Sequence, residues 1–325
     1  MTDHTLDDLR EARAVLSMLG CGHHAALHEL LIQRGPVGAL AWLTATNRSA
    51  RDRSMYLDGM TADKLHTRAT ALRQATRHAG ARVLIPEDQQ WPQQLDDLIN
   101  VDFTQAPAAA LCLWARGRSD AQLQQMVAVT GSRAATSYGI TVTTRLAGEL
   151  ADAGWTVAAS GGYGIDAAAL RGALAVNGQT VALLPCGIDR LYPDGNHSLL
   201  QRIAATGLLL SAYPPGTSPS RELLAGTARL LAAMTSGTLV VEAGSRSGSL
   251  ISLREAAVHD RPAMVVPGPV TSAMSAGIHR ALRQQAGIRV VRNSTDVLAD
   301  LAAASGDQPP TVNESDTAVT ETGRP

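Results

Sequence analysis

Residues 126–139 read MVAVTGSRAATSYG, in which a valine-rich apolar run stops at a glycine and small polar residues follow. Similar apolar runs recur along the chain, separated by stretches in which apolar residues have helical spacing. They are TVAAS (156–160), TVALLP (180–185), GLLLSAY (207–213), TLVVEA (238–243) and AMVVPG (263–268). Continuous apolar strands that alternate with helices are typical of a parallel sheet covered on both faces. The sequence therefore predicts an α/β fold with a doubly wound, mostly parallel sheet, and IRVVR (288–292) is a candidate last strand.

The segments on either side of these runs divide the chain into four predicted parts. Residues 1–80 contain LDDLREARAVLSML and HAALHELLIQRG, whose apolar spacing of three and four predicts a small helical domain that Gly35-Pro36 interrupts. Residues 81–118 supply two short apolar strands around a connection rich in proline and glutamine. The core is predicted over 119–302. Residues 303–325 are polar and aperiodic, so we predict a disordered tail there.

Composition limits the function classes. Hydrophobic residues make up 45% of 325, enough for a full core, which excludes a disordered or collagen-like chain. Aromatic residues make up only 3%, so extensive base stacking is not available. The net charge is −1, of which residues 306–325 contribute −3, leaving +2 for residues 1–305. This balance neither requires nor forbids a nucleic-acid partner.

Cysteine usage indicates a reducing compartment. Cys21, Cys112 and Cys186 are scattered without CxxC spacing, which argues against structural zinc. Cys21 with His23 and His24 resembles a metal-ligand set, but we interpret these as ordinary residues at a helix start and predict no metal and no cofactor. The N-terminus lacks an apolar signal region, and no apolar run approaches the roughly 18 residues of a membrane span. We therefore predict a cytoplasmic protein without membrane contact.

Three loops share one design, in which a buried strand ends in small residues and a helix begins within a few positions. In parallel sheets such loops gather at the carboxyl edge, where open α/β folds bind ligands. The first loop carries Gly131, Ser132 and Arg133 before a helix expected from about Ser137 to Gly154. Glycine permits close approach, serine offers a hydroxyl, and arginine can hold a phosphate beside the free N–H groups of the helix. A plain tight turn is the alternative interpretation.

The second loop spans residues 160–166, where three glycines in four positions indicate unusual φ values or backbone packed against a ligand. Asp166 is predicted to be the N-cap of the next helix, a structural role that takes precedence over a catalytic one. On that helix, Arg171 either reaches a phosphate or faces water. The candidate binding residues here are Ser160, Gly161, Gly162, Gly164, Asp166 and Arg171.

The third loop follows the run that ends near Glu242, and it again places small residues before a helix. Its candidate binding residues are Arg246, Ser247, Gly248 and Ser249. Glu242 is a candidate acid or base, or else an anchor for the loop; a flexible connection is the alternative for the loop itself. Together the three loops favour a groove along one sheet edge that binds successive phosphates.

These stretches resemble a known family. In order, VAVTGSRAATSYG, SGGYGIDAAALRGAL, PCGIDRLYPDGN, SAYPPGTSP and VVEAGSRSGSLISLREAA resemble the signatures of the DNA-processing protein A family, also called DprA or Smf, and VPGPVTSAMSAGIHR resembles the closing segment of actinobacterial members. The resemblance covers about residues 126–283. It implies a non-catalytic, Rossmann-like domain that dimerises, binds single-stranded DNA and loads the RecA recombinase during natural transformation or related recombination. It also implies that residues 131–133, 160–166 and 246–249 form the DNA pocket.

The chain departs from the family pattern in ways that weaken DNA contact. SGGYGID is one residue shorter than the usual SGxAxGID, and Leu170 stands where members commonly carry histidine. A usual Arg-Asn-Arg reads Thr227-Ala228-Arg229, which leaves Arg229 as a candidate DNA contact. The winged-helix domain that ends many members is not expected here.

Two other functions stay open. One is a nucleotide-processing enzyme resembling the cytokinin-activating phosphoribohydrolases, whose motif is PGGxGTxxE. However, Ile165 occupies the threonine position and Ala168 the glutamate position, so the catalytic carboxylate is missing at that spacing. The other is a protein-interaction module that has lost DNA binding. The sequence does not fix a homodimer interface, for which apolar helix faces near 223–234 and 270–283 are candidates.

Overall fold

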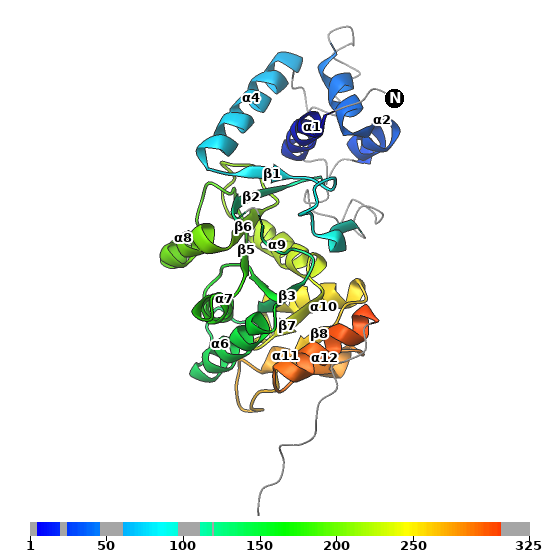
Figure 1. Ribbon diagram of the computed structural model, residues 1–325. Coiled ribbons are helices and arrows are strands. Elements are labelled where there is room, and N and C mark those ends of the chain that lie inside the picture. The colour runs from blue at the N-terminus through cyan, green and yellow to red at the C-terminus, as the bar shows by residue number, and fades with distance from the viewer. Residues whose placement is uncertain (1–4, 20–24, 46–60, 97–110, 119, 307–325) are drawn as a thin grey trace, which may run out of the picture.

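The computed structural model describes residues 5–19, 25–45, 61–96, 111–118 and 120–306. The predicted disordered tail at 303–325 begins too early, because residues 303–305 still belong to the helix Ser294–Ser305. The part of that tail from residue 307 onward lies outside the described range, as do Cys21, His23 and His24. Within the described residues the centre of the molecule is a nine-stranded sheet with the order β1-β2-β6-β5-β4-β3-β7-β8-β9 (Figure 1). No helix in these ranges is long and apolar enough to cross a bilayer.

The sheet is parallel over its larger part, which confirms the predicted fold class. Its parallel strands are β3 (Met126–Thr130), β4 (Thr156–Ala159), β5 (Thr180–Leu184), β6 (Leu208–Ser211), β7 (Gly237–Val240), β8 (Ala263–Val265) and β9 (Arg289–Val290). From β3 to β8 every strand residue is buried, as continuous apolar runs require. Residues 81–118 are predicted to connect the helical domain to the core, and their strands also belong to the sheet. Strands β1 (Arg82–Leu84) and β2 (Leu113–Gly117) are added beyond β6 in antiparallel orientation.

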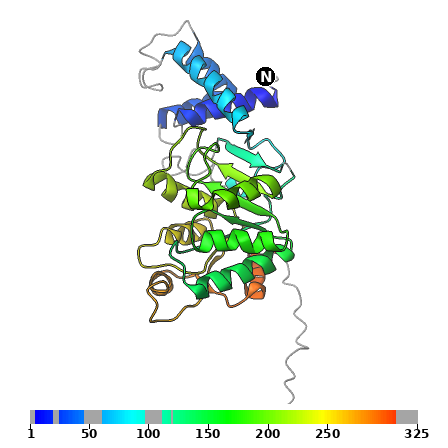
Figure 2. The ribbon, with the colours of Figure 1, turned by 90° about the vertical axis from the view of Figure 1, so that its left-hand side faces the viewer.

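Helices cover both faces of the sheet, and the strand alternation decides which side chains they meet. On β3, Val127 and Val129 pack in one layer while Met126 and Ala128 pack in the other. The first face is covered by α6 (Ser137–Asp152), α7 (Ile165–Ala175), α8 (His197–Thr206) and α12 (Ser294–Ser305). Figure 2 shows the green helices of this face in front of the strands. The second face is covered by α9 (Arg221–Ala233), α10 (Ser249–Val258) and α11 (Ala276–Gln284).

The N-terminal residues form a helical unit above β1 (Figure 1). It contains α1 (Leu6–Met18), α2 (Ala25–Thr44) and α4 (Ala62–His78), which bury a core of their own around Leu16, Leu27 and Leu65. Helix α2 is kinked at Gly35, which has φ 65° and precedes Pro36. Glycine tolerates this left-handed value and proline cannot donate to the preceding turn, so the break lies where the sequence predicts it.

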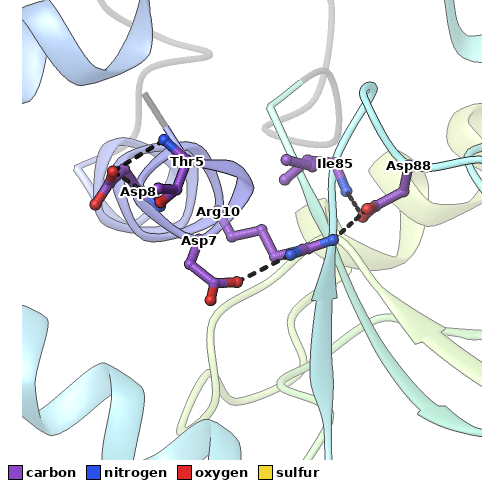
Figure 3. A network of polar contacts seen from close by, with 6 residues as sticks. All are labelled: Thr5, Asp7, Asp8, Arg10, Ile85 and Asp88. Carbon is purple, nitrogen blue, oxygen red and sulfur yellow. Dashed lines mark hydrogen bonds and ion pairs between the residues drawn. The ribbon is translucent and has the colours of Figure 1, made fainter. Parts of the chain in front are cut away.

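Charged contacts fasten the helical unit to the sheet. Arg10 on α1 is paired with Asp88 in the turn after β1 (Figure 3). In a second pair, Arg13 Nη2 lies 2.6 Å from Glu87 Oε1. Asp88 is held in place because its Oδ2 accepts a 3.0 Å hydrogen bond from the backbone N–H of Ile85. The Asp88 hydrogen bond raises the pKa of Arg10. The unit is therefore docked through a fixed turn rather than through mobile surface side chains.

Candidate nucleic-acid interface

The strand order creates a crevice between β3 and β7. From β3 the chain moves outward through β4, β5 and β6, and it then returns to the other side of β3 to begin β7. The loop after β3 leads to α6 on one face, whereas the loop after β7 leads to α10 on the opposite face. Because the two loops diverge, the carboxyl ends of these neighbouring strands stay open.

A hollow of about 580 Å³ occupies this switch point. All three loops singled out in the sequence contribute to its wall, together with the facing sides of α9 and α10. The predicted residues that line it are Gly131, Ser132, Arg133, Ser160, Asp166, Arg246, Ser247, Gly248 and Ser249. Five predicted residues do not line it: Gly161, Gly162, Gly164, Arg171 and Arg229.

The first loop is pressed against its neighbours by backbone contacts. Ser132 N donates a 2.7 Å hydrogen bond to Glu242 O, across from β3 to the end of β7. A Cβ at Gly131 would lie 2.7 Å from that same carbonyl and from Ile165 Cγ1, so no larger residue fits without displacement. This packing leaves the Arg133 side chain exposed at the hollow.

Glu242 anchors the loop by holding the residue that caps α6. It is 3% exposed; Oε1 accepts a 2.6 Å hydrogen bond from Thr136 Oγ1, and Oε2 accepts one of 2.9 Å from Thr136 N. Thr136 is the N-cap, directly before the predicted helix start at Ser137, because its hydroxyl accepts from Gly139 N at 3.1 Å. Glu242 was considered as an acid or base or as an anchor for the loop, and these contacts correspond to the anchor.

Asp166 is not the N-cap of α7, contrary to the sequence prediction. Gly164, with φ 69°, occupies that position, so Asp166 lies inside the first turn and is 5% exposed. Its Oδ1 accepts a 2.7 Å hydrogen bond from Thr130 Oγ1, and its Oδ2 accepts from both the backbone N–H and the hydroxyl of Ser160. Burial raises the pKa of this carboxyl, against the opposing effect of those donors. Asp166 therefore ties the end of β3 to the end of β4.

The glycines of the second loop allow it to pack closely against the neighbouring loops. A Cβ at Gly164 would lie 2.5 Å from Arg133 O and would overlap Ser132 O. On the other side, Asn196 Nδ2 donates hydrogen bonds of 2.9 Å to the carbonyls of Gly161 and Gly162. The unusual φ values expected from the sequence are present at two of the three positions, 72° at Gly161 and 69° at Gly164.

Sequence reasoning missed Arg221, Asn196 and Met274. Arg221 is exposed in the first turn of α9, and Met274 approaches Ser132 Oγ at 3.2 Å; both line the hollow. Asn196 carried a signal, because it ends the PCGIDRLYPDGN motif. Arg221 carried none, since only the packing of α9 beside α10 brings it to the site. By contrast, Arg229 lies outside the hollow and 4.0 Å from Glu255 Oε2.

The hollow is electropositive. Arg133, Arg221 and Arg246 line it, and none of them has an ion-pair partner among the residues that the structure describes. Asp166 is the one acidic residue among the described lining residues, and its raised pKa moves it toward the neutral form. Over the same described ranges, no group of three or more His, Cys, Asp or Glu side chains could hold a metal ion.

Known proteins are similar to this chain in sequence. The model of the family described as DNA recombination-mediator protein A matches residues 82–302. A putative DNA processing protein DprA from Mycobacterium tuberculosis is 41% identical over 242 residues, which cover 71% of this chain and 61% of that protein. DNA processing protein DprA from Streptococcus pneumoniae is 34% identical over 207 residues, covering 63% of this chain and 72% of the relative. The chain thus spans less than two thirds of the length of the mycobacterial relative.

Solved structures agree with the sequence matches. The crystal structure of DprA from S. pneumoniae superposes with a TM-score of 0.67 at 25% identity, covering 88% of this chain and 95% of that one. A structure of DNA processing protein A from Helicobacter pylori, reported for its single-stranded DNA binding mode, superposes with a TM-score of 0.57 at 27% identity. That match covers 67% of this chain and 93% of the H. pylori chain.

Proposed function

The chain belongs to the DNA recombination-mediator protein A family, and from this premise we propose that it binds single-stranded DNA without sequence preference and without catalysis. The observation that carries the proposal is the convergence of Arg133, Arg221 and Arg246 on one hollow at the switch point of the sheet. Each guanidinium offers a planar fork of donors that matches phosphate oxygens. Arginines from three separate elements suit a ligand with several phosphates better than a single nucleotide.

The backbone around the hollow supports the same ligand. Helix α10 begins at Ser249, and its N-cap Gly248 makes no side-chain capping hydrogen bond. Leu250 N and Ile251 N already donate to Ser247 O and Gly248 O. The N-terminus of α10 lines the hollow through Gly248 and Ser249, so the positive end of the helix dipole favours an anion there. Contacts to phosphates do not read base sequence, so the proposed binding is independent of sequence.

The carboxylates near the hollow support a non-catalytic role over nucleotide hydrolysis. Asp166 has both oxygens engaged by Thr130 and Ser160, and Glu242 has both engaged by Thr136. A general base needs an oxygen within reach of the proton that it removes. Incubation with nucleoside monophosphates is expected to release no free base; turnover would reverse this part of the proposal.

Binding of a labelled oligothymidylate, followed by fluorescence anisotropy over a salt series, tests the proposal. Affinity is expected to fall steeply with salt, because each neutralised phosphate of a single strand releases counterions and contributes about −0.7 to the slope of log K against log salt. Arg133→Ala should weaken binding to oligonucleotides of any sequence about equally and should make the slope shallower by about 0.7. A protein that gives no shift even at low salt would instead favour a pure protein-interaction role.

Arg229→Ala is the matched control. Arg229 is exposed on α9, like Arg221, but it lies outside the hollow and close to Glu255. Arg221→Ala is expected to reproduce the loss caused by Arg133→Ala, whereas Arg229→Ala is expected to leave both affinity and salt slope near their original values. Equal losses in all three variants would mean that general surface charge, and not this hollow, holds the DNA.

The proposal extends to partners and location. We propose a cytoplasmic homodimer that delivers the bound strand to RecA, as the family resemblance implies. The candidate dimer faces are those of residues 223–234, within and just after α9, and residues 270–283, which include most of α11. Light scattering of the purified protein measures its oligomeric state, and RecA filament formation on coated single strands measures delivery.

A further inference from the structure

We propose that Tyr163 forms a nucleobase-stacking subsite beside the arginine-lined hollow. The inference rests on the proposed function and adds a contact that recognises the strand as nucleic acid, since phosphate contacts alone do not distinguish DNA from other polyanions. The ligand class is a purine or pyrimidine ring of the same strand whose phosphates occupy the hollow.

The backbone places Tyr163 directly against the loop that carries Arg133. The next residue, Gly164, packs so closely on that loop that a Cβ would lie 2.5 Å from Arg133 O. One residue further on, Ile165 N donates a 3.1 Å hydrogen bond to Ser132 O. A strand held by Arg133 therefore passes close to the segment that bears the tyrosine.

The tyrosine ring is fixed before any ligand arrives. Its hydroxyl accepts a 3.2 Å hydrogen bond from Gly195 N, and a Cβ at Gly195 would lie 2.9 Å from Tyr163 Cε1, so the ring rests on that glycine. The same turn clamps the loop a second time, because Asn196 Nδ2 binds the carbonyls of Gly161 and Gly162. Little conformational entropy is left to lose when a base packs on this ring.

The ring is nevertheless open to solvent. Tyr163 is 45% exposed, and among the described residues Tyr138 is the other aromatic side chain with comparable exposure, at 44%. In a chain with so few aromatic residues, an exposed and doubly anchored tyrosine next to the loop that carries Arg133 is the arrangement that stacking requires. Tyr138 lies on α6, and its hydroxyl donates to Pro267 O beyond the end of β8, so it serves as a control of equal chemistry.

The unmodified protein gives the first test. Its affinity is measured for an oligothymidylate and for an oligonucleotide of the same length in which every nucleotide is abasic. Both carry the same phosphates, so a stacking subsite predicts about tenfold tighter binding of the oligothymidylate with the same salt slope. If the protein binds both equally, the stacking subsite is refuted and the phosphate site survives. If it binds neither, both proposals fail.

Variants assign the difference to the ring. Tyr163→Ala should lose about tenfold in affinity for the oligothymidylate and nothing for the abasic strand, and Tyr163→Phe should recover most of the loss because it keeps the ring. Tyr138→Ala should bind both strands as the unmodified protein does. The subsite is excluded if Tyr163→Ala weakens both strands alike, which would indicate a structural effect, or if Tyr138→Ala loses as much as Tyr163→Ala.

Discussion

Asp166 shows how one buried carboxyl connects stability to the chemistry of the hollow. It accepts hydrogen bonds from the ends of two strands, while burial works against its ionised form and raises its pKa. A carboxyl nearer to neutrality repels a neighbouring phosphate less than a full negative charge would. The residue can therefore join the loops without cancelling the attraction of the arginines.

The raised pKa predicts a pH dependence for Asp166→Asn. The folded protein keeps the proton to a higher pH than the unfolded chain, in which the pKa of an aspartate is about 3.9. The stabilisation is complete below that value and is lost as pH rises through the folded pKa, so the unmodified protein should lose free energy of unfolding relative to the variant as the pH rises above about 4. Urea unfolding at several pH values measures the difference. If the unmodified protein instead gains free energy of unfolding relative to the variant as the pH rises, the hydrogen-bond donors outweigh burial and the pKa of Asp166 is lowered.

Two thiols are expected to be inert for a similar reason. Cys112 and Cys186 are free and buried, and burial raises the pKa of each to about 12. Because the thiolate is the reactive form, neither should react at pH 8 with an aromatic disulfide reagent until the protein unfolds. The variant Cys21→Ser leaves Cys112 and Cys186 as the cysteines of the chain. We expect that no thiol of the folded variant reacts rapidly with the reagent and that two thiols react in urea. Rapid labelling of the folded variant would contradict the burial of these side chains.

Among the elements, α6 depends on a cap from another strand. Thr136→Ala removes the helix N-cap and also removes the hydroxyl that donates to the buried Glu242, while the backbone N–H at position 136 can still donate to it. We expect the free energy of unfolding to fall by about 2–3 kcal/mol, more than for a simple cap. Asn293→Ala, which removes the ordinary cap of α12, should cost about 1 kcal/mol. Equal losses, measured by urea denaturation, would show that Glu242 does not depend on Thr136.

The elements themselves were largely predictable, but their side-chain partners were not. Strands such as Met126–Thr130 stand out because a buried parallel strand must be apolar throughout. The strand predicted at GLLLSAY (207–213) is longer than the observed one, because only Leu208–Ser211 pairs with the neighbouring strands. The sequence does not show where the chain leaves the sheet. Asp166 looked like a cap because its first-turn position suits one, whereas its partners lie on strands distant in sequence. Arg221 was missed for the same reason: helix packing, and not local pattern, brings it to the hollow.

At the scale of the whole molecule, the turn at Asp88 decides how firmly the helical unit is docked. Asp88→Asn keeps an acceptor for Ile85 N but removes the charge that pairs with Arg10 (Figure 3). The pair is partly exposed, with side chains 31% and 13% accessible, so we expect a loss of about 1–2 kcal/mol in docking. Hydrogen exchange should rise in α1 and α4 and stay unchanged in β3 to β8.

Asp120→Asn provides the comparison for that experiment. Asp120 pairs with Arg118, but the two side chains are 65% and 50% exposed, and such pairs contribute little to stability. Exchange in the helical unit should match that of the unmodified protein. If Asp88→Asn also leaves exchange in α1 unchanged, the apolar contacts of Ala14 and Leu72 with Ile85 and Trp114 suffice to hold the unit.

The pairing of β3 with β7 is the least local contact at the centre of the sheet, since three strands and four α-helices come between them in the chain. A nascent polypeptide cannot close that seam until its late strands have emerged, so the arginine cluster comes into being only as folding finishes. A protein that binds a polyanion through this cluster has therefore completed the folding of the sheet. By mass action, a bound DNA strand at free concentration [L] stabilises the folded state by RT ln(1 + [L]/Kd). This stabilisation acts at the β3–β7 pairing, whose formation costs the most chain entropy because it closes the longest loop.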